Sequence, residues 1–229
     1  MKMTNNIKIK RAISELRNGR FVLIHDNKFR ENETDLMVAA EFITPEHISK
    51  MRSDGGGLIC VSIDKELAKK INLPFMADVL KISSYKYTLL NYTAPYDIPY
   101  DEKSSFSISV NHRDTFTGIT DNDRALTIRK LAEFFKGNPT EKKFGKDFRS
   151  PGHVQLLISS GIENRGGHTE LATTLLRIAN LTPVACICEM LDSKTHNALP
   201  VEDVRRYADL HDMTLLEGGE IKNFYMHIK

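Results

Sequence analysis

Residues 21–40 read FVLIHDNKFRENETDLMVAA, which places an acidic segment between two apolar runs. The apolar runs predict core strands. The segment between them, Arg30–Asp35, carries an acid at every second position, so if it is extended, Glu31, Glu33 and Asp35 project from one face and repel one another. A hard cation such as magnesium would relieve that repulsion. The alternative is a solvated acidic loop, because charged side chains are mostly exposed.

The composition limits the class of protein. The chain has 229 residues, of which 41% are hydrophobic and 27% charged, as in an ordinary soluble globular protein. Its length fits a single domain, residues 1–229. The 32 basic and 30 acidic residues are scattered together and give a formal net charge of +2. No basic face therefore indicates a nucleic acid partner, and we expect a small substrate.

The cysteines and the N-terminus predict a cytoplasmic protein. Cys60, Cys186 and Cys188 cannot all pair and lie in apolar runs, so we interpret them as reduced, packed thiols. The first residues, Met1–Lys10, are polar and basic and lack the apolar centre of a signal peptide. The sequence has no run of about 18 apolar residues, so no membrane partner is expected.

Helical and strand patterns alternate along the chain. The predicted strands are 21–25, 58–63, 105–110, 154–159 and 184–191. The predicted helices are 9–16, 44–55, 64–71, 120–137, 169–180 and 201–210, and the tail can form one more. Residues 92–103 and 137–146 are expected to be loops. The alternation predicts an α/β fold, a single-domain three-layer α/β/α sandwich with a mixed sheet.

A second candidate site is Arg165-Gly166-Gly167-His168-Thr169-Glu170, directly before an apolar-periodic helix. The glycines let backbone N–H groups approach an oxyanion, the helix N-terminus favours negative charge, and the arginine suits a phosphate. A Gly-Gly pair before a helix is also often only a tight turn. His168 can ligate a metal, and one carboxylate of the acidic segment beside it would leave positions open for substrate oxygens.

Two further residues can carry chemistry. His153 follows a Pro-Gly turn at the entrance to a strand and can act as a general acid or base, or be a histidine hydrogen-bonded at a strand end. Glu189 interrupts an apolar run, where an unpaired carboxylate would be costly to bury, unless the strand simply ends there in solvent. The remaining histidines in polar surroundings are expected at the surface: His47, His112, His196, His211 and His227.

Five blocks together closely resemble the 3,4-dihydroxy-2-butanone 4-phosphate synthase family of riboflavin biosynthesis. They are Arg30–Asp35, Phe116–Thr120 with Asp123–Ala125, Arg149–His153, Arg165–Glu170 and Cys188–Glu189. The resemblance, from about Ile7 to Phe224, implies a homodimer with active sites at the subunit interface and two Mg²⁺ or Mn²⁺ ions per site with substrate. It implies conversion of D-ribulose 5-phosphate to formate and L-3,4-dihydroxy-2-butanone 4-phosphate.

Carried over position by position, the resemblance implies a role for each site residue. The metal ligands would be Glu31 and His168. The sugar phosphate would be held by Arg30, Asp35, Arg165, Gly166, Gly167, His168 and Thr169. The essential residues would be His153 and Glu189, with Glu33 an acid for proton transfer, Asp26 an active-site acid, and Cys60 and Thr117 lining the pocket.

The sequence departs from the family in three places. Thr34 stands where many bacterial members have glycine, and Asp192–Asn197 lacks the expected glycine-containing turn, which leaves the shape of that loop open. Many relatives continue into a GTP cyclohydrolase II domain, whereas this chain stops at Lys229, so the resemblance implies a monofunctional form.

The implied chemistry begins with enolisation next to a ketone, assisted by a metal, a base and an acid. Dehydration, a carbon-skeleton shift and hydrolytic loss of formate follow. Two other functions are considered. A metal-dependent pentose-phosphate isomerase or aldolase would share the enediol step and release no formate. A non-catalytic nucleotide- or RNA-binding module of a related fold would tolerate loss of Glu31 and His168.

Overall fold

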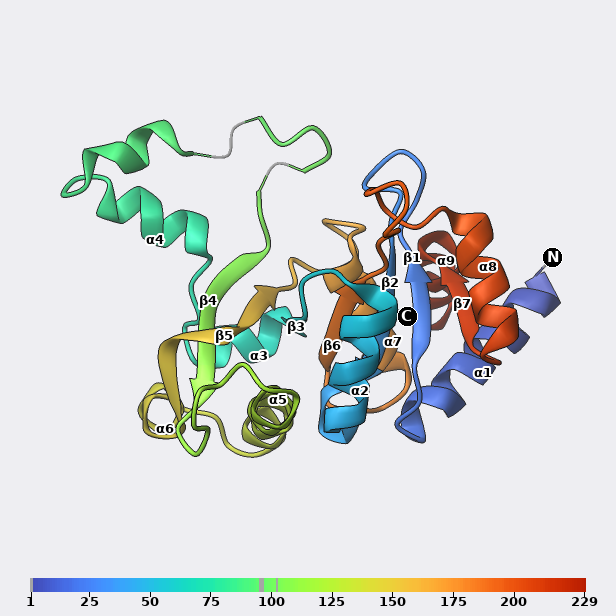
Figure 1. The fold of residues 1–229 in the computed structure, drawn as a ribbon, viewed down its shortest axis with the longest axis horizontal. Helices are drawn as coiled ribbons and strands as arrows, with labels where there is room; N and C mark the ends of the chain where they lie inside the picture. Colours follow the sequence, from blue (N-terminus) through green and yellow to red (C-terminus); the bar gives the residue numbers. More distant parts are fainter. Residues whose placement is uncertain (1, 95–96, 102) are drawn as a thin grey trace.

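A seven-stranded mixed sheet forms the centre of the molecule (Figure 1). The computed structural model describes residues 2–94, 97–101 and 103–229. The strand order is β4-β5-β3-β6-β2-β1-β7. The strands are β1 (Val22–His25), β2 (Thr34–Ala39), β3 (Cys60–Ile63), β4 (Phe106–His112), β5 (Phe148–Ile158), β6 (Val184–Glu189) and β7 (Thr214–Glu217).

The two apolar runs around the acidic segment become strands, as predicted, and the structure makes them neighbours in the sheet. β1 pairs antiparallel with β2, so the acidic segment is the connection between them. β2 also pairs antiparallel with β6, and this register sets Asp35 opposite Glu189. Side chains of directly opposite residues lie on the same face of a sheet. The fold therefore brings an acid of the N-terminal hairpin beside one from the C-terminal part of the chain.

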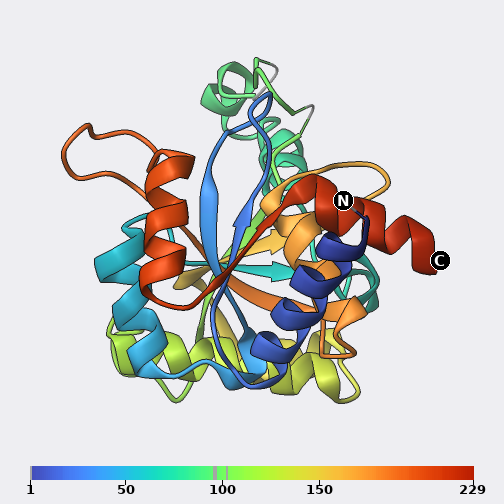
Figure 2. The same ribbon diagram turned by 90° about the vertical axis from the view of Figure 1, so that its right-hand side faces the viewer.

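Helices cover both faces of the sheet, which confirms the predicted α/β/α layering (Figure 2). One face packs against the helices α2 (Pro45–Lys50), α5 (Asp121–Lys136) and α8 (Val201–Leu210). The other packs against α1 (Lys2–Arg17), α7 (His168–Ile178) and α9 (Gly218–Ile228). Each layer is apolar where it meets the sheet, because burying apolar surface is the main favourable contribution to folding.

Helix ends follow the predicted capping signals. The Thr120 hydroxyl accepts the Asp123 N–H at the start of α5, and Gly137 follows its last residue. Thr44 caps α2, which continues into the π-helical turn η2 (Met51–Gly55). Helix α3 (Lys65–Lys70) begins after Asp64, whose side chain accepts the Glu66 N–H. These helix ends could be predicted from the sequence because each depends on the side chain of a residue at the end itself.

Between β3 and β4 a segment extends away from the sheet (Figure 1). It contains the helix α4 (Met76–Ser83) and the 3₁₀ turn η3 (Thr88–Tyr92), neither of which was predicted. α4 has no fully buried residue. The short η1 (Ala40–Phe42) and the strand β7, which pairs parallel with β1, were also not predicted.

Two predictions about the region around β5 are wrong. Residues 137–146, expected to be a loop, contain the helix α6 (Glu141–Asp147), which is capped by Thr140 and held by Phe144 against Phe148. His112, expected at the surface, is buried with its ring edge-on to Phe148. Long-range aromatic packing decides both, and a local pattern does not report it. Among the described residues no helix is long and apolar enough to cross a membrane.

Candidate active site

The acidic segment is a turn and not an extended strand as far as Glu33. The Asp26 carboxylate accepts the backbone N–H groups of Glu31 (3.0 Å) and Glu33 (3.1 Å), and Asn32 has a left-handed φ of 56°. Because Asp26 draws the backbone around itself, only the end of the segment enters β2, with Asp35. The stretch is therefore not extended, so the condition under which the three acids would share one face of a strand is not met.

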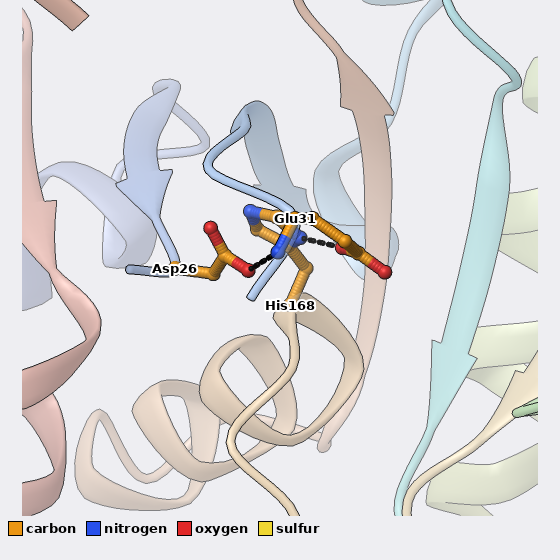
Figure 3. Close-up of side chains that lie close together, drawn as sticks. All are labelled: Asp26, Glu31 and His168. Atoms are coloured by element: carbon orange, nitrogen blue, oxygen red, sulfur yellow. Dashed lines mark hydrogen bonds and ion pairs between the residues drawn. The ribbon is translucent and has the colours of Figure 1, made fainter. Parts of the chain in front are cut away.

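The turn nevertheless brings Glu31 to His168, the first residue of α7 (Figure 3). Glu31 Oε2 lies 3.2 Å from His168 Nδ1. One potential ligand atom each from Asp26, Glu31 and His168 lies within 4.8 Å of the others. Asp26 holds the turn through two backbone N–H groups, whereas Glu31 and His168 contact each other through their side chains. The structure thus brings together the two residues that the sequence suggested as metal ligands.

The donor set fits a divalent cation. It joins a carboxylate oxygen to an imidazole nitrogen, and the buried Asp35 Oδ1 has no hydrogen-bond partner among the described residues. This oxygen lies 3.7 Å from His168 Nε2. A buried, unsatisfied carboxylate oxygen is costly, and a cation held nearby would reduce that cost.

Burial and neighbouring charges give these acids different proton affinities. Burial acts to raise the pKa of Glu31, but its hydrogen bond to His168 and the charge of Arg30 lower it to about 2. Burial raises the pKa of Asp35 to about 8. Burial acts to lower the pKa of His168, yet Asp35 and Glu31 raise it to about 9. Burial and the charge of Glu31 raise the pKa of Glu33. The site therefore holds an ionised acid beside acids that retain protons more readily.

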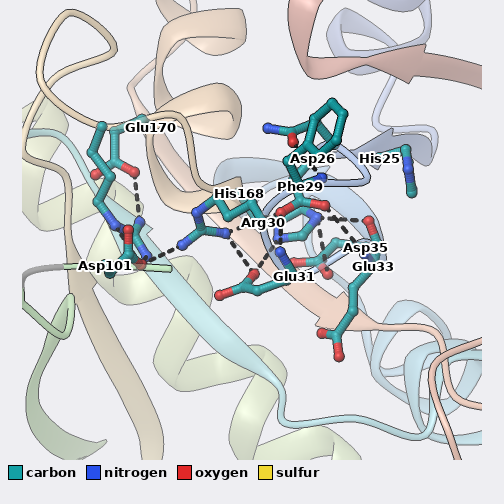
Figure 4. Close-up of polar contacts among 12 residues, drawn as sticks. His25, Asp26, Phe29, Arg30, Glu31, Glu33, Asp35, Asp101, His168 and Glu170 are labelled. Carbon is teal, nitrogen blue, oxygen red and sulfur yellow. Dashed lines mark hydrogen bonds and ion pairs between the residues drawn. The ribbon is translucent and has the colours of Figure 1, made fainter. Parts of the chain in front are cut away.

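Arg30 and Arg165 share one carboxylate, that of Asp101, and Arg30 also contacts Glu31 (Figure 4). Asp101 Oδ2 accepts from Arg30 Nη2 (2.5 Å) and from Arg165 Nη2 (2.6 Å). Arg165 also donates to the buried Glu170 (2.6 Å), and Arg30 to Asp26 (3.2 Å). The guanidinium groups lie beside the N-terminus of α7, where negative charge is favoured. This arrangement suits an anion, and Asp101 holds that position here.

A cavity of about 140 Å³ connects the acids with Arg165. It is lined by Glu31, Asp35, Ile98, Tyr100, Asp101, Ser104, Ser105, Phe106, Leu157, Arg165, His168, Thr169, Ile187 and Glu189. Glu189, the last residue of β6, is half-buried and accepts the Leu58 N–H at 2.7 Å. Glu189 therefore lies at a strand end, as one interpretation of the sequence held, and its carboxylate has a partner, as the other required.

Eight predicted site residues are not among the described residues lining this cavity: Asp26, Arg30, Glu33, Cys60, Thr117, His153, Gly166 and Gly167. Cys60 is buried in the core cluster between the sheet and the helices α1, α7 and α9. Thr117 and His153 are exposed and lie together at the β4–β5 edge, where Asn111 bonds to both. Cys186 and Cys188 are packed in the core, as predicted.

Sequence reasoning missed Asp101 and Asn111. Asp101 lies in a polar segment whose composition carries no signal for burial between arginines. Asn111 left a signal, since it is a polar residue directly after the apolar positions of a predicted strand, where a buried amide needs partners.

Comparison with known proteins identifies the family. The sequence profile described as 3,4-dihydroxy-2-butanone 4-phosphate synthase matches residues 10–224. A protein of that name from Methanothermobacter thermautotrophicus is 50% identical over 225 residues, covering 97% of this chain and 98% of that protein. Another from Methanosarcina acetivorans is 44% identical over 229 residues, covering 96% and 92%.

A solved structure supports the same assignment. The crystal structure of 3,4-dihydroxy-2-butanone 4-phosphate synthase in complex with two magnesium ions has a TM-score of 0.74 and 28% identity to this chain. The match covers 93% of this chain and 94% of that one. From this similarity in sequence and fold, the chain belongs to the 3,4-dihydroxy-2-butanone 4-phosphate synthase family.

Proposed function

We propose that this chain, as one catalytic domain, converts D-ribulose 5-phosphate to formate and L-3,4-dihydroxy-2-butanone 4-phosphate in riboflavin biosynthesis. The observation that carries the proposal is the Glu31–His168 pair beside Asp35 and Glu189, next to two arginines that share the Asp101 carboxylate. That pattern offers a metal site and an anion site next to each other. Family membership supplies the reaction.

Glu31 and His168 would hold the metal, Mg²⁺ or Mn²⁺. Two ions would be bound in each site when substrate is present. A bound divalent cation withdraws electron density from the ketone and hydroxyl oxygens and so makes the adjacent C–H more acidic. Glu31 suits this role because its depressed pKa keeps it ionised. His168 is fixed by α7, with Nε2 3.2 Å from the Glu33 carbonyl oxygen, so its ring cannot turn freely.

The arginines would bind and orient the phosphate. Arg30 and Arg165 present planar donor groups, which match phosphate oxygens in pairs. The backbone N–H groups at Gly166–Thr169 lie at the start of a helix and add donors without a charge to desolvate. Binding energy from the phosphate, which does not react, can hold the carbon end in a reactive position.

The remaining acids would move protons. Burial raises the pKa of both Glu33 and Asp35, so each holds a proton more readily than an exposed carboxyl group and suits proton transfer to or from the substrate. Glu189 lies opposite Asp35 in the sheet and faces the same cavity. Several acids around one substrate suit a reaction that needs more than one proton transfer.

His153 and Thr117 would act in the site of a second subunit. Both are exposed at the β4–β5 edge, and the exposed apolar side chains Phe106, Phe116 and Ile119 lie on or near the same strands. A homodimer formed through this surface would cover these apolar groups and add two polar ones to the partner's cavity. We place the enzyme in the cytoplasm, in line with three buried, unpaired cysteines.

One experiment tests the reaction. Purified protein is mixed with ribulose 5-phosphate, with and without magnesium, and followed by one-dimensional NMR. We expect formate and a four-carbon ketone to appear as substrate is lost, to stop with EDTA and to resume when magnesium is added. Substrate loss without formate would favour an isomerase or aldolase instead. No conversion by folded, metal-loaded protein would contradict an enzymatic role and favour a binding module.

A further inference from the structure

Asn111 lies beside His153 and makes three hydrogen bonds. It is near the end of β4 and only 4% exposed. Its Oδ1 accepts the backbone N–H of His153 at 2.8 Å. Its Nδ2 lies 3.3 Å from the Thr117 carbonyl oxygen and 3.1 Å from His153 Nδ1. The amide thus joins the two exposed residues that the proposed function assigns to a partner's site.

The backbone fixes which way this amide points. A backbone N–H only donates and a backbone carbonyl only accepts. If oxygen and nitrogen of the Asn111 amide were exchanged, Nδ2 would face the His153 N–H and Oδ1 would face the Thr117 oxygen. Both contacts would then be repulsive. The orientation therefore follows from the two backbone partners and does not depend on the histidine ring.

Gly118 restrains the amide from the other side. A Cβ at Gly118 would lie 2.0 Å from Asn111 Nδ2, so the glycine backbone packs directly on the amide. Gly118 has a φ of 91°, which side chains rarely adopt, and its N–H donates to Asp123 at 2.8 Å. The turn that carries Thr117 is thereby anchored to α5, and Asn111 cannot rotate without disturbing it.

The orientation of Asn111 determines which nitrogen of a neutral His153 ring carries the proton. An amide nitrogen has only N–H donors, so the nearby Nδ1 must accept, and the proton of the neutral ring must be on Nε2. We propose that Asn111 is a positioning residue that holds His153 as the Nε2–H tautomer, so that His153 serves the reaction as a hydrogen-bond donor and not as a base. This rests on the proposed function, in which His153 meets substrate.

The other two states of the His153 ring have a proton on Nδ1, and the Asn111 amide N–H disfavours a proton there. A neutral ring able to accept at Nε2 has its proton on Nδ1, and so does the doubly protonated ring. In each, Nδ1–H would point at an Asn111 N–H. In enolisation the proton from carbon would then go to a carboxylate such as Glu33, while the oxygen that gains negative charge accepts a hydrogen bond from Nε2–H. No proton leaves His153. Other enzymes with enediol chemistry use a neutral imidazole in this way.

The tautomer of His153 can be measured directly by NMR. The full chain is labelled with ¹⁵N-histidine, and long-range ¹H–¹⁵N spectra are recorded without substrate, at a pH where the rings are neutral. His153→Gln identifies the signals. We expect the chemical shift of a protonated nitrogen at Nε2 and of an unprotonated one at Nδ1. A protonated Nδ1 would overturn the proposal. Since no substrate is present, this result is independent of whether formate is produced.

The variant Asn111→Asp tests the effect of the tautomer on catalysis. A carboxylate accepts from Nδ1–H, so we expect the proton to move to Nδ1 and kcat to fall about 100-fold, as for loss of one donor to a developing oxyanion. The KM for ribulose 5-phosphate should change little. Asn91→Asp, an exposed site with the same charge change, is the control. Wild-type kcat in Asn111→Asp with a relocated proton would overturn the donor role.

Discussion

Single residues in this site acquire their properties from contacts that the chain makes far away in sequence. Glu31 and Asp35 are near neighbours, yet the pKa of Glu31 is lowered to about 2 and that of Asp35 is raised to about 8. The difference arises because Glu31 contacts Arg30 and His168 directly, whereas Asp35 is buried with an oxygen that has no hydrogen-bond partner among the described residues.

Removing the charge of Glu31 should weaken the metal site. Glu31→Gln keeps the size of the side chain but loses the anionic oxygen beside His168. We expect Mn²⁺ to bind about 100-fold more weakly, measured by calorimetry, and formate production to lose its metal dependence along with most of its rate. Glu66→Gln, at an exposed position, is the control. Unchanged Mn²⁺ affinity in Glu31→Gln would remove this residue from the ligand set.

Asp101 should compete with anions for the two arginines. Its carboxylate is almost buried between Arg30 and Arg165, so Asp101→Asn leaves two guanidinium groups with less negative charge to balance them. We expect inorganic phosphate to inhibit this variant about tenfold more strongly than wild type, a difference of roughly 1.4 kcal/mol. Asp97→Asn, exposed on the same segment, is the control. Weaker inhibition would instead mean that Asp101 orients the arginines for phosphate.

At the scale of elements, the sequence was informative wherever a signal is local. The helix α5 could be predicted from its apolar period and from Thr120 and Gly137 at its ends. Helix α6 could not, because the contacts that stabilise it join Phe144 to aromatic rings on α5 and β5. The turn around Asp26 was missed for the same kind of reason, since one side chain caps two backbone groups further along the chain.

A polar contact between elements should make stability depend on acid. Asp54 in η2 contacts Lys50 and the Tyr207 hydroxyl of α8. Partial burial acts to raise the pKa of Asp54, but bonds from Lys50, Ser53 and Tyr207 lower it from 3.8 to about 2. A carboxyl group whose pKa is lower in the folded state stabilises that state at pH values above its unfolded pKa. This stabilisation is lost as the pH falls toward 2.

The matched variant for this contact is Asp54→Asn. We expect it to be less stable than wild type by on the order of 1–2 kcal/mol at pH 6, measured by urea unfolding. The difference should narrow as the pH is lowered to about 3. A difference that stays constant with pH would mean that the carboxylate charge is not the source of the stability.

At the scale of the whole molecule, the sheet brings the site together. The acidic turn precedes β2, Glu189 ends β6, and His168 begins α7 below them. The sequence predicted these residues as candidates and predicted the layers that hold them. It did not predict the strand order, because pairing of β2 with β6 depends on contacts between distant parts of the chain. Nor did it indicate that Asn111 holds the residues at the β4–β5 edge.

The position of His153 at that edge leads to a prediction about the assembly. Glu31 lines the cavity of its own chain, whereas His153 is exposed on another part of the sheet. If His153 acts in the partner's cavity, Glu31→Gln and His153→Gln should each be nearly inactive as homodimers. In a heterodimer of the two, one site carries both substitutions and the other carries neither.

Mixing the two variants should therefore restore activity. Random exchange of subunits makes half of the dimers mixed, each with one intact site, so we expect about one quarter of the wild-type rate of formate production. The mixture of Glu31→Gln with His168→Gln is the control, because both substitutions lie in the same cavity and no intact site can form. If Glu31 and His153 served the same subunit, every site in the mixed dimer would carry one substitution and the rate would remain at that of the single variants. Recovery of activity in the first mixture and not in the second would thus show which residues cross the interface, without a structure of the dimer.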